Sequence, residues 1–184
     1  MNHRAKYGWK TTSSRLKYRN AWISVREDGV IYPNGKPGIY GVLEKGPGVC
    51  IVPIASDGGI YLLRQYRYTI DAPAWELPAG SMNTGESEGA AARRELAEEL
   101  GMSAAKLKRL GNFYTALGHE TAEIIVFSAT GLRSRRSRAD RQYDESILET
   151  KKVSRDQLSR MIRANQINCG VTLSSLLLAS LNHR

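Results

Sequence analysis

The stretch GSMNTGESEGAAARRELAEELGM, residues 80–102, is the part of the sequence that most clearly indicates the fold. Its second half carries Glu95, Glu98 and Glu99, which stand at positions i, i+3 and i+4. Side chains with this spacing lie on one face of an α-helix. The sequence therefore predicts a helix that begins near residue 86 or 87, ends near residue 100 and gathers three carboxylates on one face.

The same helix has an apolar stripe beside its carboxylates. Ala92, Leu96 and Leu100 form this stripe, which can pack on a sheet. Gly101 follows, and glycine readily adopts the left-handed conformation that closes a helix. We expect one side of the helix to be anchored in a core and the adjoining side to be acidic.

The acidic face suggests a bound cation. Glu95 and Glu99 form a like-charged pair that costs an isolated helix about 0.2–0.5 kcal/mol, and Arg94 offsets only part of the charge. Carboxylates without neighbouring histidine or cysteine suit a hard cation, which indicates Mg²⁺ or Mn²⁺ rather than Zn²⁺. The alternative is a charged helix that faces solvent.

The flanking segments predict a sheet bracketed by helices. Apolar or alternating runs bounded by turn residues indicate strands at 21–32, 38–44, 48–55, 60–66, 74–77, 107–114, 123–129 and 147–153. Helices are expected near residues 156–164 and 172–181. This arrangement on a short chain predicts an α/β sandwich with mixed strands.

Charge and cysteine usage narrow the class of protein. The 184 residues carry a formal net charge of +9, which favours anionic ligands such as nucleotides, nucleic acids or acidic membrane surfaces, although a basic soluble surface is the alternative. Residues 133–141 hold five arginines and are expected to form a solvated loop. Cys50 and Cys169 lie among apolar residues, which predicts buried thiols. The lack of a long apolar run or a signal peptide predicts a cytoplasmic protein.

The spacing within residues 80–102 resembles a known signature, the Nudix box. The matching positions are Gly80, Glu86, Arg94, Glu95, Leu96, Glu98, Glu99, Gly101 and Met102. The resemblance implies a hydrolase that cleaves a pyrophosphate bond with a divalent metal. It also implies a Nudix-type α/β/α sandwich with a mixed sheet over residues 47–184. A small N-terminal β-layer over residues 1–46 would precede it and pair two subunits into a homodimer.

The resemblance implies roles for individual residues of the box. The implied metal ligands are Glu95 and Glu99, assisted by Glu98, and the main-chain carbonyl of Ala79. Arg94 and Glu86 would pair and hold helix and loop in register, with an indirect effect on catalysis. The metal would neutralise phosphate oxygens and lower the pKa of a bound water, which becomes the nucleophile.

The general base is expected outside the box. In the family branch that acts on ADP-ribose and nucleoside diphosphate sugars, it often comes from a loop after the box, where this chain reads GHETAE at residues 118–123. Glu123 is the first candidate and Glu120 the second. The alternative for Glu123 is an exposed carboxylate at the start of a strand.

Two further segments resemble the same branch. RQYR at residues 64–67, followed by WELPAG, resembles the approach to its box and makes Arg67 and Arg64 candidate substrate contacts. A surface ion pair is the alternative for Arg67. NAWISVR at residues 20–26 resembles the N-terminal strand region, in which Trp22 could stack on a base or could pack between strands.

The main hypothesis is metal-dependent hydrolysis of a nucleoside diphosphate sugar, ADP-ribose included, to a nucleoside monophosphate and a sugar phosphate. ADP-ribose-specific members tend to carry a proline after the box where this chain has Leu117, so a broader substrate range gains weight. The alternatives are an enzyme acting on RNA 5′ ends and a non-catalytic nucleotide-binding module. The intact Glu95, Glu98 and Glu99 argue against the latter.

Overall fold

A computed structural model of the chain describes residues 3–135 and 146–182. The chain forms two compact units, which we call the N-terminal unit (Met1–Gly46 with Tyr114–Glu123) and the box unit (Pro47–Phe113 with Ile124–Arg184). The segment Tyr114–Glu123 thus joins the N-terminal unit, whereas the division expected from the sequence assigns it to the main domain. Of the expected arginine-rich loop, residues 136–141 lie outside the described residues.

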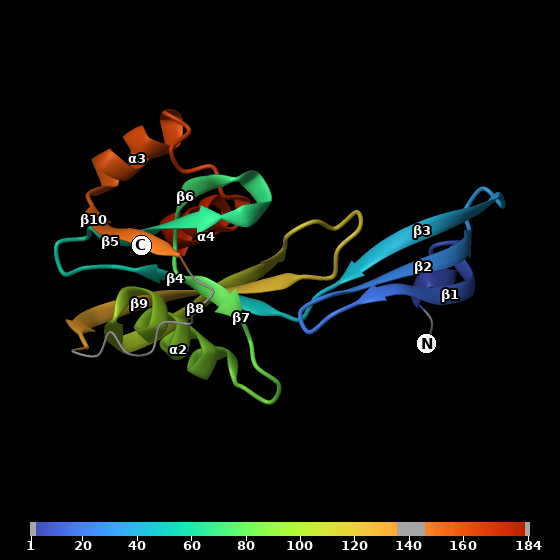
Figure 1. The fold of residues 1–184 in the computed structure, drawn as a ribbon, viewed down its shortest axis with the longest axis horizontal. Coiled ribbons are helices and arrows are strands. Elements are labelled where there is room, and N and C mark those ends of the chain that lie inside the picture. Colours follow the sequence, from blue (N-terminus) through green and yellow to red (C-terminus); the bar gives the residue numbers. More distant parts are fainter. Residues whose placement is uncertain (1–2, 136–145, 183–184) are drawn as a thin grey trace. The chain divides into compact units, whose positions relative to one another are not determined.

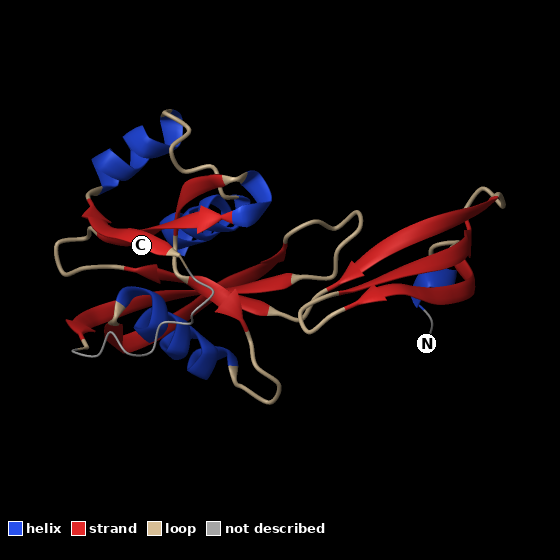
Figure 2. Ribbon diagram, viewed as in Figure 1, coloured by secondary structure: helices blue, strands red, loops and turns tan. Residues whose placement is uncertain are grey.

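The N-terminal unit contains an antiparallel three-stranded sheet with a short helix, α1 (His3–Lys6), before it (Figures 1 and 2). The sheet order is β1 (Lys10–Arg19), β2 (Ser24–Ile31) and β3 (Pro37–Glu44). The sequence patterns do not predict β1, because nearly all of its side chains are exposed and therefore show no apolar alternation.

The box unit contains two sheets. The first has the order β7-β4-β9-β8, in which β4 (Gly48–Pro53) pairs parallel with β9 (Glu123–Ser134) and antiparallel with β7 (Ala79–Ser81). The edge strand β8 (Met102–Tyr114) begins earlier than expected. The second sheet has the antiparallel order β10 (Ile147–Val153), β5 (Ile60–Arg67) and β6 (Ala72–Glu76). A 3₁₀ turn, η1 (Tyr68–Ile70), joins β5 to β6.

Strand β4 is buried on both faces and separates two apolar cores. Its odd-numbered residues, Val49 and Ile51, pack with the apolar stripe of α2 (Glu88–Leu100), whereas Cys50 and Val52 pack with α4 (Gly170–Asn182) and α3 (Arg155–Arg163). In Figure 1, α2 and α4 accordingly lie on opposite faces of the first sheet. The expected α/β/α sandwich with a mixed sheet is confirmed.

Helix α2 has the predicted boundaries. Its N-terminal cap is Ser87, whose side chain accepts a hydrogen bond from the N–H of Ala90 at 3.3 Å. Its C-terminal cap is Gly101, with φ at 64° and its N–H bonded to the carbonyl of Ala97. Strand β7 immediately before the loop is not among the strands expected from the sequence, in which the preceding strand covers residues 74–77.

The two cysteines are free, as expected. Cys50 is fully buried on β4, and burial raises the pKa of its thiol to about 12. Cys169 is only partly buried, which corrects the expectation for this residue. Over the described residues, every helix is too short or too polar to cross a membrane.

Candidate metal and active site

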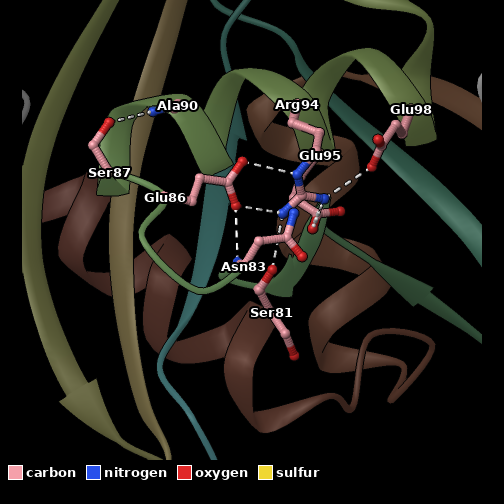
Figure 3. A network of polar contacts seen from close by, with 8 residues as sticks. All are labelled: Ser81, Asn83, Glu86, Ser87, Ala90, Arg94, Glu95 and Glu98. Atoms are coloured by element: carbon pink, nitrogen blue, oxygen red, sulfur yellow. Dashed lines mark hydrogen bonds and ion pairs between the residues drawn. The ribbon is translucent and has the colours of Figure 1, made fainter. Parts of the chain in front are cut away.

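Arg94 is the centre of a polar network on α2 (Figure 3). It donates to Glu86 through Nε and Nη2, each at 2.9 Å, and to Glu95 and Glu98 through Nη1 at 2.6 Å and 2.9 Å. Nη2 also donates to the carbonyl of Ser81 at 2.9 Å. One guanidinium therefore binds three carboxylates and joins the helix to the loop before it.

The loop between β7 and α2 is fixed by Glu86. Its carboxylate accepts the N–H of Asn83 at 3.0 Å, and its own N–H donates to the carbonyl of Asn83 at 3.0 Å. The hydrogen bonds from Arg94 lower the pKa of Glu86 because they favour the charged carboxylate, and they raise the pKa of Arg94. The ion pair expected between these two residues is present.

Two carboxylates of the box are buried. Glu95 is 4% exposed and Glu99 is 1% exposed. Glu99 accepts a hydrogen bond from the N–H of Ala79 at 2.9 Å, so α2 is joined directly to β7. Burying carboxylates is costly unless positive charge and hydrogen-bond donors compensate them, which makes this region a favourable place for a cation.

Gly80 explains how Glu95 comes so close to β7. A Cβ atom at residue 80 would lie 2.0 Å from Oε1 of Glu95, so any side chain there would displace the carboxylate. Gly80 itself is held opposite Val49 in the pairing of β4 with β7. The glycine of the box is thus needed for a close approach between a strand and a helix carboxylate.

The donor set suits a hard divalent cation, although the ligands are not preassembled. Within residues 3–135 and 146–182, no three His, Cys, Asp or Glu side chains are grouped as ligands of one ion. Arg94 instead binds Glu95 and Glu98, and Glu99 accepts the N–H of Ala79. Carboxylate and main-chain oxygens without thiol or imidazole nevertheless match the preference of Mg²⁺ or Mn²⁺.

Arg67 is engaged in a two-pronged ion pair. It donates to Glu76 through Nε at 2.8 Å and through Nη2 at 2.6 Å. The side chain of Glu76 is 7% exposed and that of Arg67 is 39% exposed, and this pairing raises the pKa of Arg67. The ion pair is therefore real and partly buried, while contact between Arg67 and phosphate stays a prediction. Arg64 lies half-buried on the same strand, opposite Trp75.

The remaining candidates belong to the N-terminal unit. Trp22 is 74% exposed in the connection between β1 and β2, so the alternative that it packs between strands is wrong. Glu120 forms an isolated β-bridge with Leu43, and its Oε1 atom lies 3.9 Å from Nζ of Lys45. Glu123 is half-buried at the first position of β9. The roles of these residues in substrate binding and catalysis stay predictions.

Two residues that hold the site in place are not among those predicted from the sequence. Glu76 is the partner of Arg67, and its signal is a charged residue inside the apolar strand segment 74–77. Thr172 on α4 accepts the N–H of Leu77 at 3.1 Å in the buried interior. A single threonine in an apolar helix carries no recognisable signal, because its partner is 95 residues away in the chain.

Comparisons with known proteins match both parts of the chain. The family model for the NUDIX domain matches residues 44–168, and that for the nucleoside diphosphate sugar hydrolase N-terminal domain matches residues 9–43. An ADP-ribose pyrophosphatase from Mycobacterium tuberculosis is 36% identical over 130 residues, which are 70% of this chain and 63% of the relative. Just under two thirds of that relative is therefore covered.

A second relative and a solved structure extend the match over most of the chain. An ADP-ribose pyrophosphatase from Bacillus subtilis is 26% identical over 158 residues, or 86% of this chain and 85% of the relative. A crystal structure of an ADP compounds hydrolase has a TM-score of 0.81 at 21% identity and covers 94% and 92% of the two chains, which supports the fold. The chain belongs to the Nudix hydrolase family and combines the Nudix domain with the N-terminal domain of nucleoside diphosphate sugar hydrolases.

Proposed function

We propose that the protein hydrolyses the pyrophosphate bond of a nucleoside diphosphate sugar, ADP-ribose included, to a nucleoside monophosphate and a sugar phosphate. The observation that carries this proposal is the Arg94 network, which holds the intact box carboxylates against β7. The match of residues 9–43 favours nucleoside diphosphate sugars over RNA 5′ ends. The two ADP-ribose pyrophosphatase relatives favour the same choice.

Hydrolases of this family generally use divalent metal ions, and we propose Mg²⁺ or Mn²⁺ for this chain. The residues that would hold the ion are Glu95, Glu98, Glu99 and the main-chain carbonyl of Ala79. When bound, the ion neutralises phosphate oxygens and lowers the pKa of a water molecule. Arg94 acts as a positioning residue, because it holds Glu95 and Glu98 together and anchors the loop through Ser81.

Glu123 is the proposed general base, which takes the proton of the attacking water. Glu120 is the second candidate, although its ion pair with Lys45 supports a structural role for it. The test compares kcat of Glu123→Gln with that of Glu120→Gln. A large loss in Glu123→Gln alone supports the assignment, whereas equal and small losses would mean that a glutamate of the box activates the water.

Trp22 is the proposed stacking residue for the nucleobase. Its exposure leaves the indole face available, and base–aromatic stacking contributes about 1–3 kcal/mol. Trp22→Ala should therefore raise KM by roughly five- to 150-fold with little change in stability. A KM equal to that of the wild type would remove Trp22 from the site.

The proposed assembly is a homodimer formed through the N-terminal unit. This unit exposes several large apolar side chains besides Trp22, which support an interface: Leu16, Tyr18 and Ile39. Light scattering coupled to size-exclusion chromatography would measure the mass in solution. A monomer at micromolar concentration would contradict the dimer without affecting the proposed chemistry.

The decisive experiment is a substrate panel assayed with Mg²⁺ and with EDTA. The panel contains several nucleoside diphosphate sugars, ADP-ribose, dinucleotides and 5′-triphosphorylated RNA, and the readout is the release of phosphatase-sensitive products. We expect kcat/KM to be highest for a nucleotide sugar and turnover to stop with EDTA. A preference for RNA, with affinity that falls steeply between about 50 and 200 mM salt, would overturn the proposed substrate class.

A further inference from the structure

The segment of residues 77–79, which joins β6 to β7, has each of its main-chain N–H groups bound by a helix side chain. Leu77 donates to Oγ1 of Thr172 on α4 at 3.1 Å, and Ala79 donates to Oε2 of Glu99 on α2 at 2.9 Å. Pro78 has no N–H, and its carbonyl accepts from the N–H of Ile51 at 2.9 Å. Helices on opposite faces of the sheet therefore hold the same three residues.

The contact from α4 is fully buried. Leu77 and Thr172 are each 1% exposed, and the next turn of α4 packs on β4 through Leu176. An N–H group in such surroundings has no access to water, so losing its acceptor would leave an unsatisfied donor or force the segment to shift. The hydroxyl of Thr172 thus fixes where the chain enters β7.

We propose that Thr172 is a positioning residue of the metal site, which holds residues 77–79 so that the carbonyl of Ala79 is in place as a ligand. The inference rests on the proposed function, because it takes Ala79 and Glu99 as metal ligands. Thr172 lies beyond residues 44–168, which match the model of the NUDIX domain. Its action is indirect, through the main chain of Leu77.

The test measures Mn²⁺ binding in the absence of substrate, by electron paramagnetic resonance of the free ion. Thr172→Val keeps the shape and removes the acceptor, whereas Thr172→Ser keeps the hydroxyl. Partners that orient a metal ligand typically change affinity by about 10–100-fold, and we expect the low end for Thr172→Val. Thr172→Ser should stay within about twofold of the wild type.

Ser175→Ala is the matched control. Ser175 is fully buried one turn further along α4 and has no hydrogen bond to residues 77–79 among those described. Its variant reports the effect of a lost buried hydroxyl on the packing of α4. We expect Mn²⁺ affinity of Ser175→Ala to equal that of the wild type, even if its free energy of unfolding falls.

A second measurement is independent of the metal. Hydrogen exchange of the Leu77 amide should be slow in the wild type and in Thr172→Ser, and faster in Thr172→Val.

A third measurement is kinetic. Thr172→Val should need a higher Mg²⁺ concentration for half-maximal rate, with an unchanged KM for substrate at saturating Mg²⁺. Thr172→Ala replaces Thr172→Val in all measurements if the latter does not fold.

Glu99→Gln separates failure of this inference from failure of the proposed site. If Glu99→Gln weakens Mn²⁺ binding and Thr172→Val does not, the role of Thr172 is wrong and the site stands. Equal losses in Thr172→Val and Thr172→Ser would also overturn the role, since the hydroxyl would not be the cause. If Glu99→Gln binds Mn²⁺ like the wild type, the proposed ligands and the role of Thr172 fall together.

Discussion

Two arginines, Arg94 in the box unit and Arg26 in the N-terminal unit, each bind several carboxylates, but in different surroundings. Arg26 pairs with Asp28 on the same face of β2 and with Glu44 on the neighbouring β3. Arg94 binds three carboxylates, and the buried Glu99 lies on the same helix. Negative charge therefore exceeds positive charge more strongly around Arg94, and this excess distinguishes the proposed cation site from an ion pair that only supports a sheet.

Removing one negative charge from the carboxylates around Arg94 should have the largest effect on activity. Glu99→Gln keeps an oxygen that can accept the N–H of Ala79 but loses the charge of a proposed metal ligand. We expect kcat/KM with Mg²⁺ to fall by about 100-fold or more, while the free energy of unfolding measured with urea changes little. Turnover like that of the wild type would contradict the ligand assignment.

The matched control is Glu88→Gln on the same helix. Glu88 forms an exposed pair with Arg109 at 2.9 Å, and both side chains are more than 40% exposed. Exposed pairs contribute about 0–1 kcal/mol. Activity close to that of the wild type in Glu88→Gln would show that the loss in Glu99→Gln does not arise from the general acidity of α2.

Gly80→Ala tests the close approach of Glu95 to β7. The added methyl group would meet Oε1 of Glu95 at 2.0 Å, so the carboxylate must move. We expect kcat/KM to fall by about 10–100-fold. Gly89→Ala on α2 is the control, because a Cβ there meets nothing within 4 Å and should stabilise the helix by about 0.5–1 kcal/mol. Equal activity in both variants would remove Gly80 from the site.

Ion pairs of the two units should also differ in their contribution to stability. Arg67→Ala leaves the carboxylate of Glu76 buried without its two hydrogen bonds and should lower the free energy of unfolding by about 1–3 kcal/mol. Lys17→Ala removes an exposed partner of Glu27 and should cost about 0–1 kcal/mol. Urea denaturation of both variants would measure the difference. Equal costs would mean that burial of Glu76 does not decide the outcome.

The sequence predicts best those contacts that are close along the chain. Glu86, Arg94 and Glu98 lie within one loop and helix, so their spacing alone indicates the network. The contact between Thr172 and Leu77 depends on how α4 packs against β4, and no local pattern encodes that packing. Strand β1 was missed for a different reason, because its exposed side chains carry no apolar alternation.

The smallest expected effect concerns pH and the loop before α2. Arg94 lowers the pKa of Glu86 in the folded protein. Their contact therefore stabilises the fold fully above the pKa of glutamate in the unfolded chain, about 4.3. This stabilisation is lost as pH falls through the lower pKa of the folded protein. Glu86→Gln should cost about 1 kcal/mol at pH 7 because it weakens two charge-assisted hydrogen bonds. The difference in free energy of unfolding between wild type and Glu86→Gln should shrink as pH is lowered from 7 to 3. A difference that stays constant over this range would mean that the charge of Glu86 contributes nothing, and that its hydrogen bond with Asn83 alone fixes the loop.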